Sequence, residues 1–315
     1  MNKVKINLII INLCFTFIFS NIVNASTNFY IVTKVDNEII TNIDIIDEAN
    51  YLIALNNDLK KIDKKSLINL AKNSLIREKI KRNELNKYPN SMLVKEDILE
   101  NLIQNYYKKL NLNDMNEFKN YLAAYNVDLY DVKERIKIEI FWNRHIYTKY
   151  KNLLNVNVEE LKKKIDDNKH NNNKITKYLL SEILFSLENK TNFEKKNNEI
   201  REKIQDNGFK TTANIFSISN TAKFGGRIGL MNEKQLSPKI LKEIESIQPG
   251  EITNTIDVPN GFLILKLEEI IIEEFEKDLK SELDNLIRFE TERQLNQFSI
   301  IYFNKLQLNS KISHE

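Results

Sequence analysis

The stretch AKFGGRIGLMNEKQLSPKI, residues 222–240, contains three of the six glycines in this 315-residue chain. All six lie between Gly208 and Gly261, together with three of the four prolines. Glycine and proline mark turns that need special backbone angles. The middle of the chain is therefore expected to form a compact, turn-rich α/β unit, while both flanks are expected to be mostly helical.

The first residues read MNKVKINLIIINLCFTFIFSNIVNAS, with Lys3 and Lys5 ahead of an apolar stretch from Leu8 to Phe19. A basic start, a short apolar core and small residues before a cleavage point are typical of a secretory signal peptide. The apolar run is shorter than the ~20 residues that a membrane-spanning helix needs. We therefore expect residues 1–25 to be a cleaved signal peptide that leaves no stable membrane anchor.

Charge and cysteine content narrow the classes of protein further. The whole chain has 47 basic and 44 acidic residues, and loss of Lys3 and Lys5 with the signal peptide leaves 45 against 44, a net charge of +1. This near neutrality argues against a nucleic-acid partner. The only cysteine, Cys14, lies within the signal peptide, so we expect no disulfide in the mature chain.

The mature N-terminus predicts a hairpin followed by helices. Apolar residues flank a polar Asp36-Asn37 pair, which favours a short turn between two strands, and Thr41 followed by Asp44 gives a helix start resembling a capping box. Apolar residues then recur at helical spacing. Three helices are predicted in this way, over residues 64–85, 95–110 and 129–151, the last with Val132, Ile136, Ile140 and Tyr147 on one face.

The C-terminal flank predicts one long amphipathic helix from residue 271 onward, because it contains no glycine or proline. We expect this helix to pack on the N-terminal helices and to complete one helical domain from two separated segments. The polar, patternless residues 166–174 are interpreted as a linker. The expected buried face of the helix comprises Phe275, Leu279, Leu283, Leu286, Leu295 and Phe298.

The middle unit has a recognisable order of elements. A strand-like ITKYLLSEILFSL is followed by a helix, the glycine-rich loop, a second helix, a Pro-Gly turn and two further strand-like runs. This order resembles the parvulin family of prolyl isomerases over residues 174–270. The pieces that carry the resemblance are Phe209 to Ala213, Ser217, the structural loop of Gly225, Gly226 and Gly229, Pro249-Gly250-Glu251, and Gly261-Phe262.

The flanks extend this resemblance to the SurA family of envelope chaperones. The signal peptide at 1–25, a helical domain at 26–173, one parvulin unit at 174–270 and a closing helix at 271–315 resemble that family's layout, although its best-known members have two parvulin units. The resemblance implies an α+β fold, a mostly helical chaperone core with an inserted parvulin-like α/β domain. It also implies unfolded outer-membrane proteins as clients, the periplasm as location and no cofactor. No segment resembles a phosphate-binding loop, so we expect function without ATP.

The parvulin resemblance also locates a candidate site. The family places two histidines and a cysteine or aspartate around the twisting amide. By this resemblance the two histidine positions are occupied here by Glu182 and Leu263, and the cysteine or aspartate position by Ser219. The apolar wall that receives the proline ring corresponds to Leu236 and Ile240, which lack the usual aromatic ring. None of the three histidines of the chain lies in this unit. We therefore expect a parvulin fold with weak isomerase activity or none.

Other chemistry in the sequence is sparse. No Cys/His cluster indicates a metal site, and the serines lack a His–Asp context for nucleophilic catalysis. His145, near Trp142, is expected to pack within the helical core. The acid pairs Glu159-Glu160 and Glu273-Glu274 are interpreted as solvated helix faces.

Three functions fit these observations. The first is a holdase whose hairpin, 129–151 helix and C-terminal helix cover exposed apolar strands of unfolded clients. The second is an active prolyl cis–trans isomerase in which Glu182 and Ser219 replace the usual polar groups. The third is a scaffold that binds proline-containing segments in the slot at Leu236 and Ile240 without isomerising them.

Overall fold

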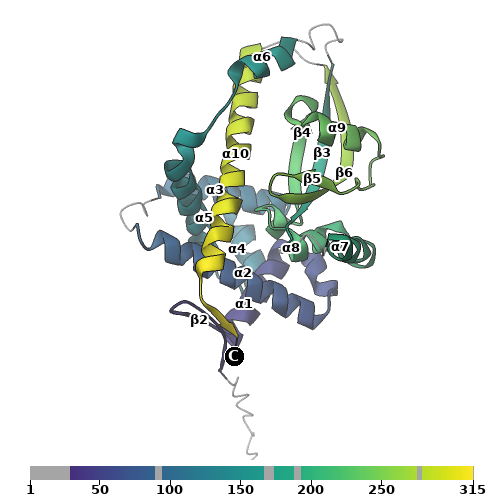
Figure 1. The fold of residues 1–315 in the computed structure, drawn as a ribbon. Coiled ribbons are helices and arrows are strands. Elements are labelled where there is room, and N and C mark those ends of the chain that lie inside the picture. Colours follow the sequence, from purple (N-terminus) through teal and green to yellow (C-terminus); the bar gives the residue numbers. More distant parts are fainter. Residues whose placement is uncertain (1–28, 89–93, 167–173, 188–192, 275–278, 315) are drawn as a thin grey trace, which may run out of the picture.

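The computed structural model describes residues 29–88, 94–166, 174–187, 193–274 and 279–314. Within these ranges the chain is an α+β protein, with a helical core formed by both ends of the sequence and an α/β module inserted between them (Figure 1). The predicted signal peptide and most of the predicted linker lie outside the described residues. No described helix is both long and apolar enough to cross a bilayer.

The helical core is built from the following elements: β1 (Ile31–Val35), β2 (Glu38–Thr41), α1 (Asn42–Leu55), η1 (Asn57–Lys61), α2 (Lys64–Leu85), α3 (Glu96–Lys109), α4 (Met115–Ala123), α5 (Leu129–Tyr150), η3 (Lys151–Leu153), α6 (Val158–Asp166), α10 (Leu279–Asn309) and β7 (Ile312–His314). The module comprises β3 (Lys174–Phe185), α7 (Phe193–Asn207), α8 (Phe209–Phe216), η6 (Ala222–Phe224), β4 (Arg227–Asn232), η7 (Glu233–Gln235), α9 (Pro238–Glu245), β5 (Ile256–Val258) and β6 (Gly261–Glu274).

The predicted N-terminal hairpin and helix start are confirmed. Strands β1 and β2 pair across a turn in which Asp36 adopts a φ of 53°. Thr41 then caps α1, because its hydroxyl accepts from the Asp44 backbone N–H at 3.2 Å while the Thr41 N–H donates to the Asp44 carboxylate at 2.7 Å. A strand that the sequence did not predict, β7, pairs with β1 and brings His314 opposite Thr33.

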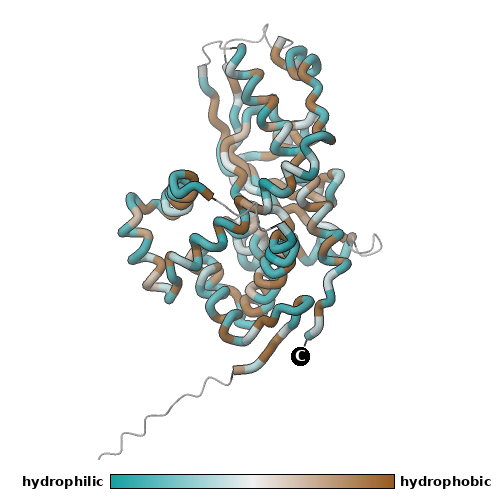
Figure 2. The backbone as a smooth tube through the Cα atoms, turned by 90° about the vertical axis from the view of Figure 1, so that its left-hand side faces the viewer, coloured by the Kyte–Doolittle hydropathy of each residue, from teal (hydrophilic) through white to brown (hydrophobic). Residues whose placement is uncertain are grey.

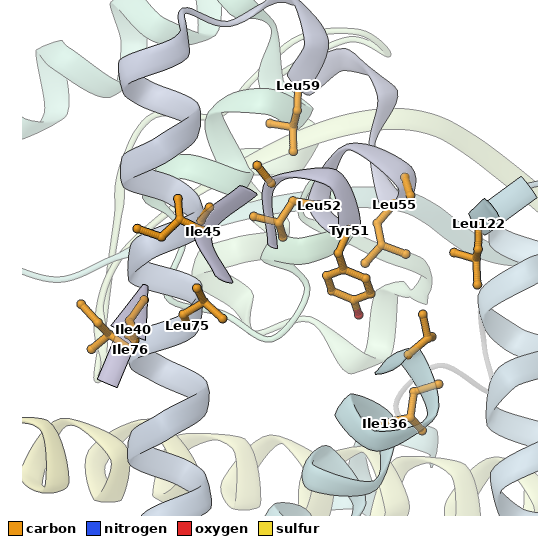
Figure 3. Close-up of a cluster of buried hydrophobic side chains, with 14 of the residues drawn as sticks. Ile40, Ile45, Tyr51, Leu52, Leu55, Leu59, Leu75, Ile76, Leu122 and Ile136 are labelled. Atoms are coloured by element: carbon orange, nitrogen blue, oxygen red, sulfur yellow. The ribbon is translucent and has the colours of Figure 1, made fainter. Parts of the chain in front are cut away.

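The predicted helices are confirmed as α2, α3 and α5, and α4 is an additional helix. On α5, Val132 and Ile136 are buried, whereas Tyr147, expected on the same face, is 49% exposed. Toward its C-terminal end α5 instead buries Trp142 and Ile146, which pack with residues of α10 on another side of the helix. Figure 3 shows the resulting core, in which side chains from β2, α1, α2, α4 and α5 converge.

The C-terminal helix α10 packs on the N-terminal helices, as predicted. Trp142 of α5 donates its indole N–H to the Ser299 hydroxyl of α10 at 2.8 Å, and both residues are buried. Leu295 and Phe298 join the apolar cluster around Trp142, while Leu283 and Leu286 pack with α6. In Figure 1 the upper part of α10 runs beside the module and its lower part crosses the N-terminal helices, and in Figure 2 apolar and polar residues alternate along the helices.

The predicted start of this helix at residue 271 was wrong. Residues up to Glu274 continue β6, because β3 pairs with β6 along its whole length, from Phe185 opposite Phe262 to Lys174 opposite Glu274. Long-range strand pairing therefore overrides the local helical pattern. Glu273 is consequently exposed on a strand and not on a helix, and Phe275 lies outside the described residues.

The module contains a four-stranded antiparallel sheet in the order β4-β3-β6-β5. Two of its elements, α8 and β4, were not predicted separately from the stretch 209–231. The predicted strand EITNTIDV is also shorter than expected, with β5 covering only Ile256–Val258 and Ile252 forming an isolated bridge to Lys266.

Candidate functional site

The candidate site lies on one face of the module's sheet. Alternate residues of a strand point to opposite faces, and on β3 this places Leu180 and Leu184 in a cluster with Leu263 and Leu265 of β6. The opposite face of the sheet, with Ile183, packs against α7 and α8. Glu182 has the same parity as Leu180 and Leu184, so its side chain is on the first face.

The loop after α8 is held against β3 by short polar contacts. Ser217 ends α8, and its hydroxyl accepts from the backbone N–H of Leu184 at 3.1 Å and from that of Ser219 at 3.3 Å. The next residue, Ile218, donates its N–H to the Leu184 carbonyl at 2.7 Å. These contacts bring Ser219 beside Glu182.

Glu182 accepts hydrogen bonds from two hydroxyl groups of this loop. The distance to its Oε1 is 2.6 Å from Ser219 Oγ and 2.9 Å from Thr221 Oγ1. The two hydroxyl oxygens lie 3.1 Å apart. Burial raises the pKa of Glu182, and the two hydroxyl donors oppose this shift only in part. The site therefore favours a neutral carboxyl group more than water does.

The paired glycines explain how the loop can lie so close to β3. Gly225 and Gly226 have φ of 69° and 79°, in the region that side chains rarely adopt. A Cβ atom on Gly226 would lie 2.2 Å from the Glu182 carbonyl oxygen. At this position the backbones also bond, because the Glu182 N–H donates to the Gly226 carbonyl at 2.8 Å. Gly229 adopts a φ of 107° but has no such neighbour.

The predicted apolar wall belongs to the apolar cluster on the same face of the sheet. Leu236 and Ile240 are partly buried and pack in the same cluster as Leu263, which is 8% exposed. Leu263 is paired with Leu184 on β3, two residues from Glu182. The structure thus brings all five predicted pocket residues into one region of the module.

Neither a histidine nor a metal-binding cluster accompanies Glu182 in the described residues of the module. The described part of the chain contains no cluster of three or more His, Cys, Asp or Glu side chains able to hold a metal ion. His145 packs in the helical core, as predicted, with its ring 4.8 Å from that of Tyr88 and its Nε2 3.8 Å from Glu84. His314 is in β7 beside Thr33, also remote in the fold from Glu182.

Sequence reasoning missed Thr221, the second hydroxyl donor to Glu182. The two hydroxyls are close in sequence, but the turn at residues 219–221 that brings both of them to Glu182 has no distinct local sequence signal. A hollow of about 400 Å³ was also missed, and it lies outside the module. It is lined by Asn50, Ile53, Lys60, Ala124, Tyr125 and Asn126 of the helical core.

Comparison with known proteins gives matches for the module and for part of the flanks. Residues 174–269 match a family model described as a rotamase, the PPIC-type PPIase domain. The chaperone SurA of Pseudomonas putida is 29% identical over 162 residues, which are 49% of this chain. The match spans only 38% of the length of that relative.

Solved structures are similar to the module alone or to most of the chain. A crystal structure of a PpiC-type peptidyl-prolyl cis-trans isomerase domain is 25% identical, covers 32% of this chain and 94% of that domain, and has a TM-score of 0.28. A chain from the structures of two SurA-like chaperones of Campylobacter jejuni is 17% identical and covers 90% of this chain and 98% of that one, with a TM-score of 0.35.

Proposed function

We propose that this protein is an exported chaperone of the periplasm. The proposal starts from the similarity of the chain to SurA and from its match to the PPIC-type parvulin domain at residues 174–269. In this proposal it holds unfolded outer-membrane proteins without ATP and assists their folding and assembly. Its clients expose alternating apolar strands that aggregate in water.

The observation that carries the proposal is the distribution of exposed apolar side chains on the helical core. Isolated exposed apolar residues are common on any protein. Here, however, they recur on the three segments expected to contact clients. They are Phe29, Tyr30, Ile39 and Ile46 at the hairpin and the start of α1, Tyr130 and Tyr147 on α5, and Ile301 and Leu308 on α10, each at least 43% exposed.

On α10 the two exposed residues lie on one side of the helix. Ile301 and Leu308 are seven residues apart, an interval that returns to almost the same direction, and they are 57% and 88% exposed. The other side of the helix is fixed to the core through Ser299 and Tyr302, which bond Trp142 and Glu84. A client segment could therefore be covered by α10 without disturbing its packing.

In this proposal the module supplies a parvulin-like fold with an apolar slot and does not catalyse prolyl isomerisation. Rotation about an Xaa–Pro bond has a barrier of ~18–20 kcal/mol, and the parvulin polar set is replaced here by a carboxyl group held by two hydroxyls. The same polar group beside Leu236, Ile240 and Leu263 is the observation that favours the second candidate, a divergent isomerase.

Aggregation assays with an unfolded β-barrel protein test the chaperone proposal. A triple variant with Tyr147→Ser, Ile301→Ser and Leu308→Ser should need at least fivefold more protein for half-maximal suppression, because each lost apolar contact costs about 1 kcal/mol. The matched control replaces three exposed apolar residues of the module, Leu230→Ser, Ile270→Ser and Ile272→Ser, which are 43%, 40% and 65% exposed. It should change suppression less than twofold.

Circular dichroism would establish that both variants retain the fold. Full suppression by the core variant, or an equal loss in both variants, would contradict the assignment of the client surface to the helical core.

A further inference from the structure

The module inserts two consecutive residues of its glycine loop, Lys223 and Phe224, into a recess of the helical core. Helices α1, α3 and α5 supply Tyr51, Tyr106 and Glu139 to the walls of this recess. Phe224 packs against the main apolar cluster of the core, although it belongs to the module. The recess is therefore built by residues far apart in sequence and is filled from outside the core.

The aromatic half of the recess holds the Phe224 ring. Tyr106 meets this ring edge-on, with centroids 5.1 Å apart and planes at 78°, a favourable arrangement for two aromatic rings. On another side the Lys109 ammonium lies 4.2 Å from the Phe224 centroid, within the range of a cation–π contact. Both contacts depend on an aromatic side chain at position 224.

The acidic half of the recess faces Lys223. Its ammonium lies 5.6 Å from the Tyr106 ring centroid. Burial by itself lowers the pKa of Lys223, but the phenol oxygen of Tyr106, the carboxylate of Glu139 and the phenol oxygen of Tyr51 outweigh it and raise the pKa. The surroundings of Lys223 therefore favour a cation at this position.

Glu139 is held ready for that cation by the core itself. Lys81 of α2 contacts both carboxylate oxygens of Glu139 at 3.0 Å. Burial raises the pKa of Glu139, but Lys81 and then Lys223 overcome this and lower it to about 2. The Glu139 side chain still has 33% of its surface exposed, against 7% for Lys81. The carboxylate is thus ionised, positioned without Lys223 and accessible.

The contact of the module with the core extends beyond this recess and is partly polar and partly apolar, since Ile300 of α10 is buried in the module's apolar cluster. Asn56 of the core donates its amide to the Asn214 side-chain oxygen at 2.6 Å, and Asn214 in turn bonds the Ala222 carbonyl at 2.8 Å. At another point Lys234 of η7 pairs with Glu282 of α10 at 2.5 Å. Relative movement of two domains in one chain is the ordinary expectation unless their interface is large and hydrophobic, and here polar bonds make up much of the contact.

We propose that this recess is a binding site for a cation–aromatic pair, a Lys or Arg followed by an aromatic residue in a short helical turn such as η6, and that Lys223-Phe224 occupies it in cis when the module is docked. An unfolded client would supply the same pair in trans, and this part rests on the proposed chaperone function. A tethered occupant acts at an effective concentration in the millimolar range, so a free segment can compete only when the loop leaves the recess.

The test uses the loop itself as probe, a labelled peptide of residues 219–226, SNTAKFGG, followed by fluorescence anisotropy. A Lys223→Met/Phe224→Ala variant, whose recess is vacated, should bind the peptide at least tenfold more tightly than the unaltered chain. Adding Glu139→Gln to this variant should weaken binding at least fivefold. A peptide with norleucine in place of its lysine should lose affinity to the same degree.

A matched control removes another Lys–Phe pair of the module, in which the Lys196 ammonium lies 4.4 Å from the Phe216 ring centroid and neither residue belongs to the core. Lys196→Met/Phe216→Ala should bind the peptide as weakly as the unaltered chain. Absence of peptide binding to a folded Lys223→Met/Phe224→Ala variant, or binding that is indifferent to Glu139→Gln, would overturn the proposal. Neither result depends on whether the protein suppresses client aggregation.

A second measurement needs no change in the loop. In the otherwise unaltered chain, Glu139→Gln should accelerate amide hydrogen exchange at residues 222–226 at least tenfold, because it removes a nearby negative charge that favours the Lys223 cation. Unchanged exchange there would equally overturn the proposal.

Discussion

Glu182 in the module and Glu139 in the helical core are both carboxyl groups partly withdrawn from water, but their partners differ. Glu182 is bonded by the hydroxyls of Ser219 and Thr221. Glu139 is paired with the Lys81 ammonium and faces Lys223. Burial therefore prevails at Glu182 and raises its pKa, whereas the cations prevail at Glu139 and lower its pKa to about 2.

This difference separates a neutral polar site from a charged one. Hydroxyls compensate a buried carboxyl group for part of its lost hydration and do not require it to be ionised. Cations favour the ionised carboxylate, although cations that share one carboxylate repel each other, as Lys223 and Lys81 do around Glu139. The Glu182 face of the module therefore offers a neutral hydrogen-bonding group, whereas the recess of the core offers an ionised carboxylate.

The largest expected effect comes from the backbone that shapes the Glu182 site. Gly226→Ala should destabilise the chain by about 3–5 kcal/mol, because it combines a φ of 79° with a Cβ atom 2.2 Å from the Glu182 carbonyl oxygen. Gly208→Ala is the matched control, since its φ is 80° but nothing lies within 4 Å of the added Cβ. It should cost only about 1–2 kcal/mol. Urea unfolding followed by circular dichroism measures both.

Equal costs for the two alanine variants would show that the contact between Gly226 and β3 is not what requires glycine there. The close approach of Gly226 to β3 would then not explain how the Glu182 site is shaped.

The second effect concerns the charged site. Lys81→Met should destabilise the core by about 2 kcal/mol, less than the loss of a fully buried ion pair, because Glu139 is a third exposed and keeps Lys223 nearby. Lys61→Met is the control, because the Lys61–Asp58 pair is 78% and 43% exposed and should contribute less than about 0.5 kcal/mol. Fluorescence of Trp142, whose ring centroid is 5.4 Å from the Lys81 ammonium, reports the unfolding.

A Lys81→Met variant as stable as the Lys61→Met control would mean that solvent already screens Glu139. The pairing of Glu139 with Lys81 would then make no measurable contribution to the free energy of unfolding.

Acidification should act on the two carboxyl groups in opposite directions. The folded pKa of Glu139, about 2, is below its ordinary value of 4.5, so its contribution to stability is present above pH 4.5 and is lost as the pH falls toward 2. The folded pKa of Glu182 is raised, so its contribution is present below pH 4.5 and is lost as the pH rises through the folded pKa. With solvent screening of Glu139, each change should amount to about 1 kcal/mol.

Urea midpoints between pH 3 and pH 7 measure these changes. Glu139→Gln should reduce the loss of stability at acidic pH, and Glu182→Gln should stabilise the chain most at the neutral end. Glu182→Gln and Glu139→Gln profiles that shift in the same direction would contradict the comparison. Glu48 gives an internal reference, because burial raises its pKa to about 7 despite the nearby Arg135.

The sequence indicated the elements of the Glu182 site but not its bonds. The double glycine, Glu182, Ser219, Leu236, Ile240 and Leu263 could be located because a parvulin-like order of turns and strands fixes their relative positions. The part played by Thr221 depends on how the loop is drawn against β3 by Ser217 and Ile218, contacts between residues more than 30 positions apart in sequence.

Longer-range features escaped prediction for the same physical reason. The extension of β6 to Glu274 depends on its pairing with β3, and β7 exists because Thr33 and His314, at opposite ends of the sequence, become neighbours. The recess for Lys223 is formed by separate helices and has no local signature. Local propensity and spacing identified most of the helices, which need only their own periodicity and a face to bury.

The smallest expected effect is on prolyl isomerisation, where we expect none. Uncatalysed exchange of an Xaa–Pro peptide takes tens to hundreds of seconds, so NMR exchange measurements on a proline-containing peptide with the chain from residue 26 onward would detect even modest catalysis. A neutral-leaning Glu182 bonded by two hydroxyls, with Leu263 in place of an imidazole, should leave the exchange rate within twofold of the peptide alone. The control is Thr255→Ala, which removes another hydroxyl of the same module, one that is bonded to Asn197. Acceleration that disappears in Ser219→Ala but persists in this control would show that the Glu182 site catalyses isomerisation. The Glu182 site would then be the more reactive of the two carboxyl sites.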